Sequence, residues 1–189
     1  MSQLDSSRAT MDRGIALNLL GLSGISLSLL IAFYYQIVLH ELPCPLCLLQ
    51  RVGMIAIGIG FMLNLRFGER SLHYGVALIG CLLTGALAAR QVLLHIVPGT
   101  GAYGSALFGM HFYTLALLSA IAATAFIAVL LMLRRPQDAA APTTGMHAAG
   151  KMVAILFTLL IAANLLSTIL ECGAGQCDDD PTYYQLLGK

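Results

Sequence analysis

The fold is decided by residues 14–39, GIALNLLGLSGISLSLLIAFYYQIVL, a run without a single charged side chain. A helix needs roughly 20 consecutive apolar residues to cross the hydrocarbon core of a bilayer, and this run is long enough. A secretory signal peptide has an apolar region of only about 7–15 residues, and no small-residue cleavage pattern precedes the cysteines that follow. The run therefore predicts a retained transmembrane helix.

The composition of the whole chain supports this assignment. The 189 residues are 58% hydrophobic and 10% charged, with a mean hydropathy of +0.83. An ordinary globular domain is about 45–50% apolar and about 25% charged. The net charge of +1 comes without the clustered basic face that binds phosphate backbones, which argues against a nucleic-acid partner. The sequence therefore predicts an integral membrane protein whose main surroundings are the lipid bilayer.

Four further apolar runs have the length of membrane spans, at about 47–65, 71–97, 106–133 and 152–170. We therefore predict an all-α integral membrane protein, a single membrane domain over residues 1–189 whose spans pack as a helical bundle. Residues 97–105, VPGTGAYGS, contain three glycines and a proline and predict a turn-rich loop. Residues 136–150, rich in Ala, Pro, Thr and Gly, predict a flexible linker on the cytoplasmic side.

The distribution of Lys and Arg predicts the orientation, because these residues prefer the cytoplasmic side. A cytoplasmic N-terminus places seven cationic residues inside, namely Arg8, Arg13, Arg66, Arg70, Arg134, Arg135 and Lys151. An odd number of spans then carries the C-terminus, with Lys189 and an acidic tail at 171–189, to the outer face of the membrane. This topology gathers four of the five cysteines, Cys44, Cys47, Cys172 and Cys177, in the compartment where disulfides persist.

Residues 42–51, LPCPLCLLQR, contain the chain's most reactive motif. Cys44 and Cys47, two residues apart, can close a small ring and cycle between dithiol and disulfide with little backbone movement. Pro43 and Pro45 stiffen the approach by fixing φ. If a helix begins near Cys47, its unpaired backbone N–H groups and positive dipole end favour a thiolate there.

Arg51 follows Cys47 by four residues and Cys44 by seven, so all three side chains share one helical face. An arginine inside an apolar helix is costly unless it snorkels or has a partner. It is either an interfacial anchor or a functional group that stabilises a thiolate or holds the polar head of a lipid-soluble oxidant. The alignment with two cysteines favours the functional role.

Other interpretations of the cysteines remain open. Two close pairs make four thiolates, the ligand set of a structural zinc site, although such sites usually lie in soluble ribbons. A structural disulfide within Cys44 and Cys47 closes so small a ring that it constrains little of the unfolded chain. Cys81 lies inside the third apolar run and predicts a buried packing residue. Arg90 predicts an anchor, or a partner for Glu41 or Glu171.

The stretch PCPLCLLQR, at 43–51, resembles the signature of the bacterial disulfide bond formation protein B (DsbB) family, with its CxxC motif and an arginine four residues later. The segment RQVLLH, at 90–95, is similar to that family's third helix, and the resemblance covers about residues 14–133. It implies a four-helix core in the bacterial inner membrane. It also implies a quinone-dependent thiol oxidase that reoxidises a periplasmic DsbA-type dithiol oxidase and passes electrons to a membrane quinone, ubiquinone or menaquinone.

Position by position, the resemblance implies that Cys44 and Cys47 form the quinone-proximal pair, that Arg51 contacts the quinone and that His95 lies near it. Family members typically have four spans and a second cysteine pair in the second outer loop, but residues 97–112 contain no cysteine. Here the second pair, Cys172 and Cys177, follows a fifth span. We predict that this pair accepts electrons from the soluble dithiol and exchanges with Cys44 and Cys47.

Two functions of other classes compete with this prediction. A transmembrane reductant conduit would need cysteines buried in its spans, and only Cys81 is placed there. A membrane subunit without enzymatic activity would carry both cysteine pairs as structural disulfides. A bound quinone would distinguish the thiol oxidase from both.

Overall fold

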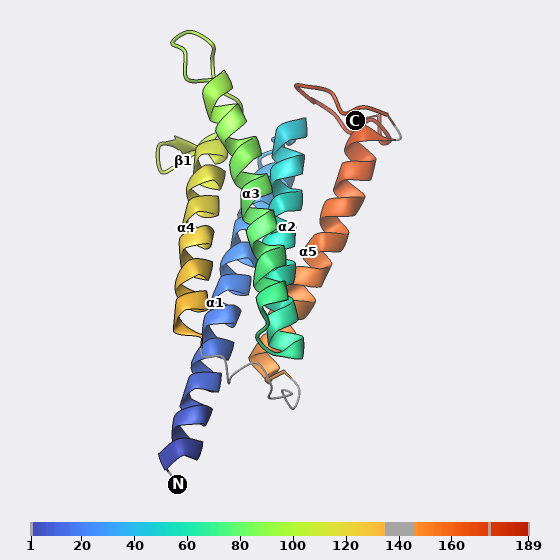
Figure 1. Ribbon diagram of the computed structural model, residues 1–189. Helices are drawn as coiled ribbons and strands as arrows, with labels where there is room; N and C mark the ends of the chain where they lie inside the picture. The colour runs from blue at the N-terminus through green and yellow to red at the C-terminus, as the bar shows by residue number, and fades with distance from the viewer. Residues whose placement is uncertain (1, 135–145, 174, 189) are drawn as a thin grey trace.

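The computed structural model describes residues 2–134, 146–173 and 175–188, and these form a bundle of long helices (Figure 1). The helices are α1 (Ser2–Val38), α2 (Pro45–Phe67), α3 (Ser71–Leu94), α4 (Phe112–Leu133) and α5 (Ala148–Cys172). Each contains an apolar window long enough to cross a membrane. The prediction of an all-α membrane bundle with about five spans is therefore confirmed. Arg135, Lys189 and most of the predicted linker lie outside the described residues.

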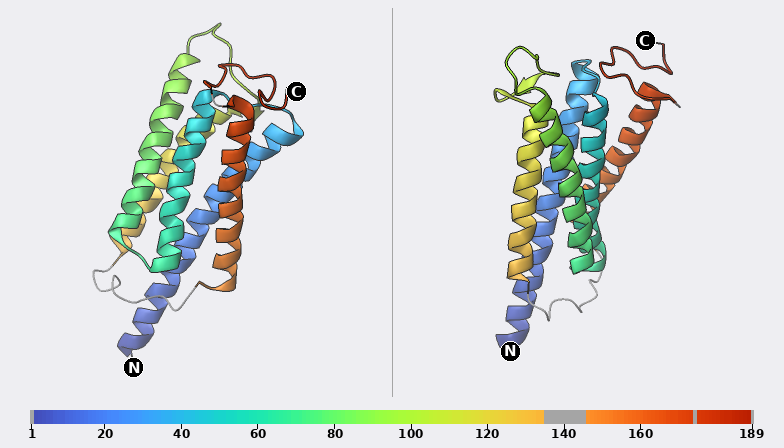
Figure 2. Two further views of the ribbon diagram at one scale, coloured as in Figure 1. Left: turned by 90° about the vertical axis from the view of Figure 1, so that its right-hand side faces the viewer. Right: turned by 45° about the horizontal axis from the view of Figure 1, so that its top comes forward.

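The helices are arranged so that both cysteine pairs lie at one end of the bundle, which we call the cysteine end. The N-terminus of α1 lies at the opposite end, whereas α2 begins and α5 ends at the cysteine end (Figure 1). α5 packs on the side formed by α1 and α2, and α4 lies on the other side of the bundle (Figure 2). The fifth helix therefore contacts the rest of the bundle mainly through α1 and α2.

Close packing between α2 and α3 depends on small residues. A Cβ atom on Gly60 would lie 2.6 Å from the carbonyl oxygen of His73, and one on Gly80 would lie 2.6 Å from the backbone nitrogen of Ile57. Small residues at such crossings let helix backbones approach within a membrane, where packing rather than the hydrophobic effect drives association. These contacts fix α3 against the C-terminal half of α2, away from the first cysteine pair.

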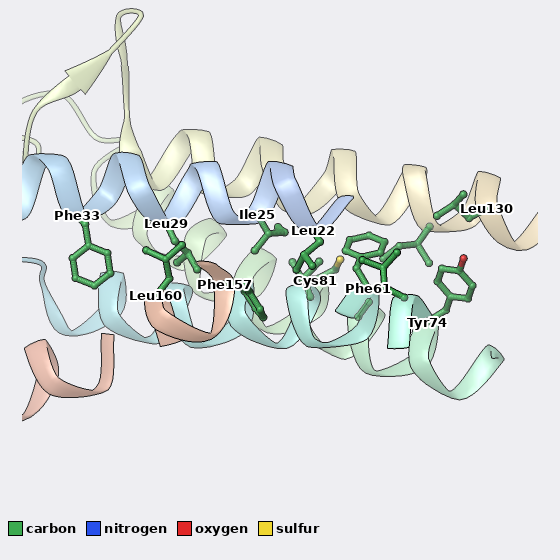
Figure 3. Close-up of a cluster of buried hydrophobic side chains, with 14 residues drawn as sticks. Leu22, Ile25, Leu29, Phe33, Phe61, Tyr74, Cys81, Leu130, Phe157 and Leu160 are labelled. Carbon is green, nitrogen blue, oxygen red and sulfur yellow. The ribbon is translucent and has the colours of Figure 1, made fainter. Parts of the chain in front are cut away.

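A continuous apolar core runs along the bundle from the cysteine end to the opposite end (Figure 3). Phe33 and Leu29 of α1 lie toward the cysteine end, and Phe157 of α5 packs in the middle. Cys81 of α3 is 3% exposed and belongs to this core, as its apolar surroundings in the sequence predict. It is the free cysteine among the described residues.

The prediction that the fourth helix starts at about Ala106 is wrong. Ala106–Leu107 (β1) and Met110–His111 (β2) pair as a short antiparallel hairpin, and α4 begins only at Phe112. The two turn residues, Phe108 and Gly109, have φ angles of 54° and 77°, which is the backbone of a tight hairpin turn. Hydropathy could not separate this apolar hairpin from the apolar helix that follows it.

Other element ends differ from the hydropathy boundaries for simple reasons. α1 extends back to Ser2, beyond the predicted start at Gly14, because hydropathy marks the edge of the membrane rather than the end of a helix. α3 ends at Leu94, ahead of Pro98, whose ring disfavours helical backbone before it. The last residues of the predicted linker, from Ala148, already belong to α5.

Candidate redox site and cavity

The first cysteine pair caps the N-terminus of α2. Cys44 is the N-cap residue, and its Sγ accepts the backbone N–H of Cys47 at 3.2 Å. Pro45 occupies the first helical turn, where its missing N–H costs no intrahelical hydrogen bond. Cys44 and Cys47 form a disulfide with their Cα atoms 5.0 Å apart. The local sequence therefore places a redox-capable pair at the positive end of a helix dipole.

Gln91 of α3 supplies a second donor to Cys44. Its Nε2 donates to Cys44 Sγ at 3.3 Å, and its Oε1 accepts from Gln50 Nε2 at 2.7 Å. Both glutamines are buried. Because Gln50 fixes the orientation of the Gln91 amide, two N–H groups point at the Cys44 sulfur. Sequence reasoning missed this role, although a glutamine inside the apolar third helix, one turn before His95, was a visible signal.

Arg51 is buried and turned toward α1. It is 8% exposed, and its Nη1 donates to Gln36 Oε1 at 2.6 Å while its Nη2 donates to the carbonyl of Ala32 at 3.3 Å. Its guanidinium also lies 5.4 Å from the centre of the Phe33 ring. This is not the geometry of a snorkelling anchor, which would carry its charge to water. Arg51 is instead held rigidly inside the bundle.

A cavity of about 260 Å³ opens beside Cys47 and Arg51. Its lining includes Ile31, Ala32 and Tyr35 from α1, Cys47, Gln50, Arg51 and Met54 from α2, Leu107 and Phe108 from the hairpin, and Phe112, Tyr113 and Leu115 from α4. The walls are mostly apolar, and polar groups come from α2 and also from Ser28, Glu41, Tyr103 and Ser119. A mostly apolar wall with a few polar groups is the usual make-up of a small-molecule site. Cys47 is half-buried and lines the cavity, whereas Cys44 is buried and does not.

His95 stands behind the cavity wall. Its Nδ1 lies 2.8 Å from the carbonyl oxygen of Gln91, and its ring stacks on that of Tyr113 with centroids 5.2 Å apart. Tyr113 lines the cavity and His95 does not. Arg90 is exposed, while Glu41 accepts hydrogen bonds from Ser105, so within the described residues the structure does not pair these two as the sequence suggested.

The loop between α3 and α4 is hydrogen-bonded to the segment between α1 and α2, just before Cys44. The Tyr103 hydroxyl donates to the carbonyl of Leu42 at 2.8 Å, and the Glu41 carboxylate accepts from the Ser105 N–H at 3.1 Å and from its hydroxyl. Burial, reinforced by nearby carboxylates, raises the pKa of Tyr103 to about 12. The hydroxyl therefore keeps the proton that it donates to Leu42 throughout the neutral pH range.

The second cysteine pair lies where α5 ends. Cys172 is its last residue, and it forms a disulfide with Cys177 across a Cα distance of 4.5 Å. Cys172 is 4% exposed and Cys177 is half-buried. The tail then folds back on the helix end, where the Leu186 N–H donates to the Leu170 carbonyl at 3.1 Å. Neither cysteine of this pair lines the cavity, whereas Cys47 and Arg51 do.

Comparison with known proteins identifies the family of this chain. A family model described as "Disulfide bond formation protein DsbB" matches residues 15–166. The chain is similar to disulfide bond formation protein B of Marinobacter nauticus, with 39% identity over 74 residues, which is 37% of this chain and 44% of that protein. Disulfide bond formation protein B 1 of Pseudomonas putida is 42% identical over 59 residues, 31% of this chain and 35% of that protein.

A third relative is disulfide bond formation protein B of Nitrosococcus oceani, 38% identical over 87 residues, which is 42% of this chain and 49% of that protein. The matched stretch thus spans less than half the length of each of these relatives. No solved structure matches the chain. The family model nevertheless covers most of the sequence, including both cysteines of the first pair and Arg51. The chain, a multi-pass membrane protein, belongs to the DsbB family of disulfide bond formation proteins.

Proposed function

We propose that this protein is a quinone-dependent thiol oxidase of the bacterial inner membrane. It reoxidises a periplasmic dithiol oxidase of the DsbA type and passes the electrons to a membrane quinone, ubiquinone or menaquinone. The observation that carries the proposal is that Cys47 and Arg51 line one largely apolar cavity at the cysteine end. A disulfide beside a cation and an apolar chamber suits electron transfer to a hydrophobic acceptor with polar carbonyl groups.

The donor set of the cavity fits a quinone headgroup. Its volume of about 260 Å³ is close to the lower end of the range for small-molecule sites, roughly 300–1,000 Å³, and suits a ring rather than a whole isoprenoid lipid. Arg51 and Gln50 would hold the carbonyl groups, because both side chains carry N–H donors. Apolar side chains such as Ile31 and Met54 would enclose the ring. A bound quinone supplies an acceptor for two electrons and two protons.

The two cysteines of the first pair divide the work in this proposal. The incoming thiolate attacks Cys44, and Cys47 leaves as a thiolate, which the positive end of the α2 dipole favours. In the reduced pair the Cys47 N–H and Gln91 Nε2 stabilise negative charge on Cys44. Cys47 faces the cavity and delivers the electrons there. In the exchange step a dithiol becomes a disulfide while the Cys44–Cys47 disulfide becomes a dithiol, so electrons and protons balance.

The contribution of Gln91 is tested by Gln91→Leu, which removes the amide donor from Cys44. A hydrogen bond to a charged group is worth about 1.5–3 kcal/mol, so we expect the reduced Cys44 to react roughly 10-fold or more slowly with an alkylating reagent at neutral pH. The rate is measured on purified reduced protein by mass spectrometry of the labelled peptide. Arg90→Gln, at an exposed position of the same helix, is the matched control. An unchanged alkylation rate in Gln91→Leu would show that the amide does not stabilise the thiolate.

The orientation of the chain is part of the same proposal, with the N-terminus in the cytoplasm and the cysteine end in the periplasm. A reporter fused after Lys189 is expected to be periplasmic, and one inserted near Thr144 is expected to be cytoplasmic, because the cationic residues favour the inner side. Paired alkaline phosphatase and green fluorescent protein fusions read out the two locations. A cytoplasmic C-terminus would separate Cys172 and Cys177 from the periplasmic dithiol.

A further inference from the structure

Gln36 joins four parts of the structure through one buried amide. It is 2% exposed, near the cysteine end of α1. Its Oε1 accepts from Arg51 of α2 at 2.6 Å, and its Nε2 donates to Ser167 Oγ of α5 at 2.6 Å and to the hydroxyl of Tyr184 in the tail at 3.1 Å. Because the Arg51 guanidinium can only donate, the Gln36 oxygen must face it, and the Gln36 NH₂ group is left to donate to the two hydroxyl groups, which hold the amide in place.

Glu171 places a buried carboxyl group within electrostatic range of the same guanidinium, without a hydrogen bond to it. It is 2% exposed, and neither of its oxygens has a hydrogen-bond partner among the described residues. Its electrostatic partner is Arg51. A buried carboxyl group without hydrogen bonds is expensive unless a cation or a proton compensates it, so such a group is rarely kept for packing alone. α5 therefore contributes both a hydroxyl group and an acidic group to the surroundings of Arg51.

The tail is folded so that Tyr184 reaches Gln36. The Gln185 and Leu186 N–H groups donate to the carbonyls of Glu171 and Leu170, at 3.3 and 3.1 Å. The Cys172–Cys177 disulfide links the last residue of α5 to the start of the tail. These contacts hold the tail against the end of α5.

None of the α5 and tail residues named above lines the cavity. They approach Arg51 from the side of α1 and α5, whereas the cavity lies between α1, α2 and α4. The family match ends at residue 166, so Ser167, Glu171 and Tyr184 all lie beyond it. Gln36 lies within the family match, but the residues of α5 and the tail that hold it lie in a part of the chain that the family model does not match.

We propose that α5 and the tail form a positioning unit for Arg51. Ser167 and Tyr184 hold Gln36 in place, and Gln36 holds the guanidinium where it lines the cavity. The buried Glu171 carboxyl group adds electrostatic attraction to this hydrogen-bonded network. These are positioning residues, because they act through Arg51. The inference rests on the proposed function in one respect, that the ligand which Arg51 holds is a quinone.

The main test removes two hydroxyl groups, in the double variant Ser167→Ala, Tyr184→Phe of the full chain. The loss of two neutral hydrogen bonds should weaken the affinity for a short-chain ubiquinone analogue roughly 10-fold. The KM for this quinone should rise by a similar factor, whereas kcat at saturating quinone should stay near the wild-type value. Tyr183→Phe, at the exposed neighbouring position, is the matched control. Wild-type affinity and KM in the double variant would overturn the proposal.

A second variant and a second readout keep the test independent of folding and of the quinone. Glu171→Gln keeps the side-chain shape and removes the charge, so it should weaken the affinity for quinone. Glu171→Asp keeps the charge and should retain part of the affinity that Glu171→Gln loses. In the oxidised protein without quinone, ¹⁵N NMR should show slow rotation of the Arg51 guanidinium, and this restraint should disappear in Ser167→Ala, Tyr184→Phe. If the wild-type chain binds no quinone, the proposed function fails, and the NMR result alone decides whether the unit positions Arg51. An equally restrained guanidinium in the double variant would refute the positioning role.

Discussion

The variant Cys172→Ser, Cys177→Ser is expected to lose roughly 100-fold or more of its rate with a soluble dithiol oxidase, because thiol–disulfide exchange needs an accessible disulfide to attack. In the relay that we propose, the second pair accepts electrons from the soluble partner and then exchanges with Cys44 and Cys47. A small dithiol such as dithiothreitol can reach the first pair without the relay, so its oxidation should continue. The two rates are measured side by side with the same quinone.

Two controls separate the relay from other effects of the substitutions. Cys81→Ser changes the free buried cysteine and should leave both rates unchanged, since Cys81 packs in the core. Tyr184→Phe weakens the contact of the tail with Gln36 without touching a cysteine. If Cys172→Ser, Cys177→Ser still reoxidises the soluble partner at the wild-type rate, the relay is wrong and Cys44 with Cys47 acts alone.

The exposure of the second pair also indicates which sulfur the partner attacks. Cys177 is half-buried, whereas Cys172 is 4% exposed at the end of α5. We therefore propose that the incoming thiolate attacks Cys177 and that Cys172 leaves. A soluble oxidase that retains only its attacking cysteine should then be trapped as a mixed disulfide. Peptide mapping of the trapped complex would locate the bond, and a link to Cys172 would reverse this assignment.

Arg51→Ala is expected to raise the KM for quinone by roughly 10- to 100-fold, because charge-assisted hydrogen bonds of about 1.5–3 kcal/mol are lost. The kinetics are measured with a short-chain quinone and a small dithiol. Arg51→Lys should recover only part of the loss, since an ammonium group lacks the planar fork of guanidinium donors. Wild-type quinone kinetics in Arg51→Ala would reduce the arginine to a structural role.

The burial of Arg51 complicates this experiment and suggests its control. Arg51→Ala also removes the positive charge that interacts with the buried carboxyl group of Glu171, and this loss could destabilise the fold. Arg51→Ala is therefore combined with Glu171→Gln, and the thermal unfolding of both forms is compared. A raised KM in the double variant, at a melting temperature near that of wild type, assigns the effect to quinone binding rather than to unfolding.

The first cysteine pair and its arginine could be predicted from the sequence because these residues are close together along the chain. Cys44, Cys47 and Arg51 lie within one turn or two of each other, so helical spacing alone indicates a common face. The five helices were predictable for a similar reason, since each apolar run carries its own hydropathy signal. The hairpin before α4 was not, because its residues are as apolar as a span and only the backbone of Phe108 and Gly109 reveals the turn.

The polar groups that support the first cysteine pair and Arg51 could not be predicted in the same way. Gln36, Gln50 and Gln91 are polar residues inside largely apolar helices, and nothing in the sequence says which of them meet. Tyr184 lies 148 residues from Gln36 along the chain, yet the two side chains are hydrogen-bonded. Only the packing of α5 against α1 brings them together. The sequence suggested Arg90 as a partner for Glu171, whereas the structure places Arg51 there.

The central claim is that electrons from a soluble dithiol reach a quinone through Cys44 and Cys47. It is tested most directly by mixing the purified chain, without oxygen, with a reduced DsbA-type oxidase and a ubiquinone analogue, and following the quinone absorbance together with the thiol content. The account predicts one quinone reduced for each disulfide formed in the soluble partner, and no reduction above background with Cys47→Ser. Disulfide formation without quinone reduction, or the same quinone reduction in Cys47→Ser, would contradict it.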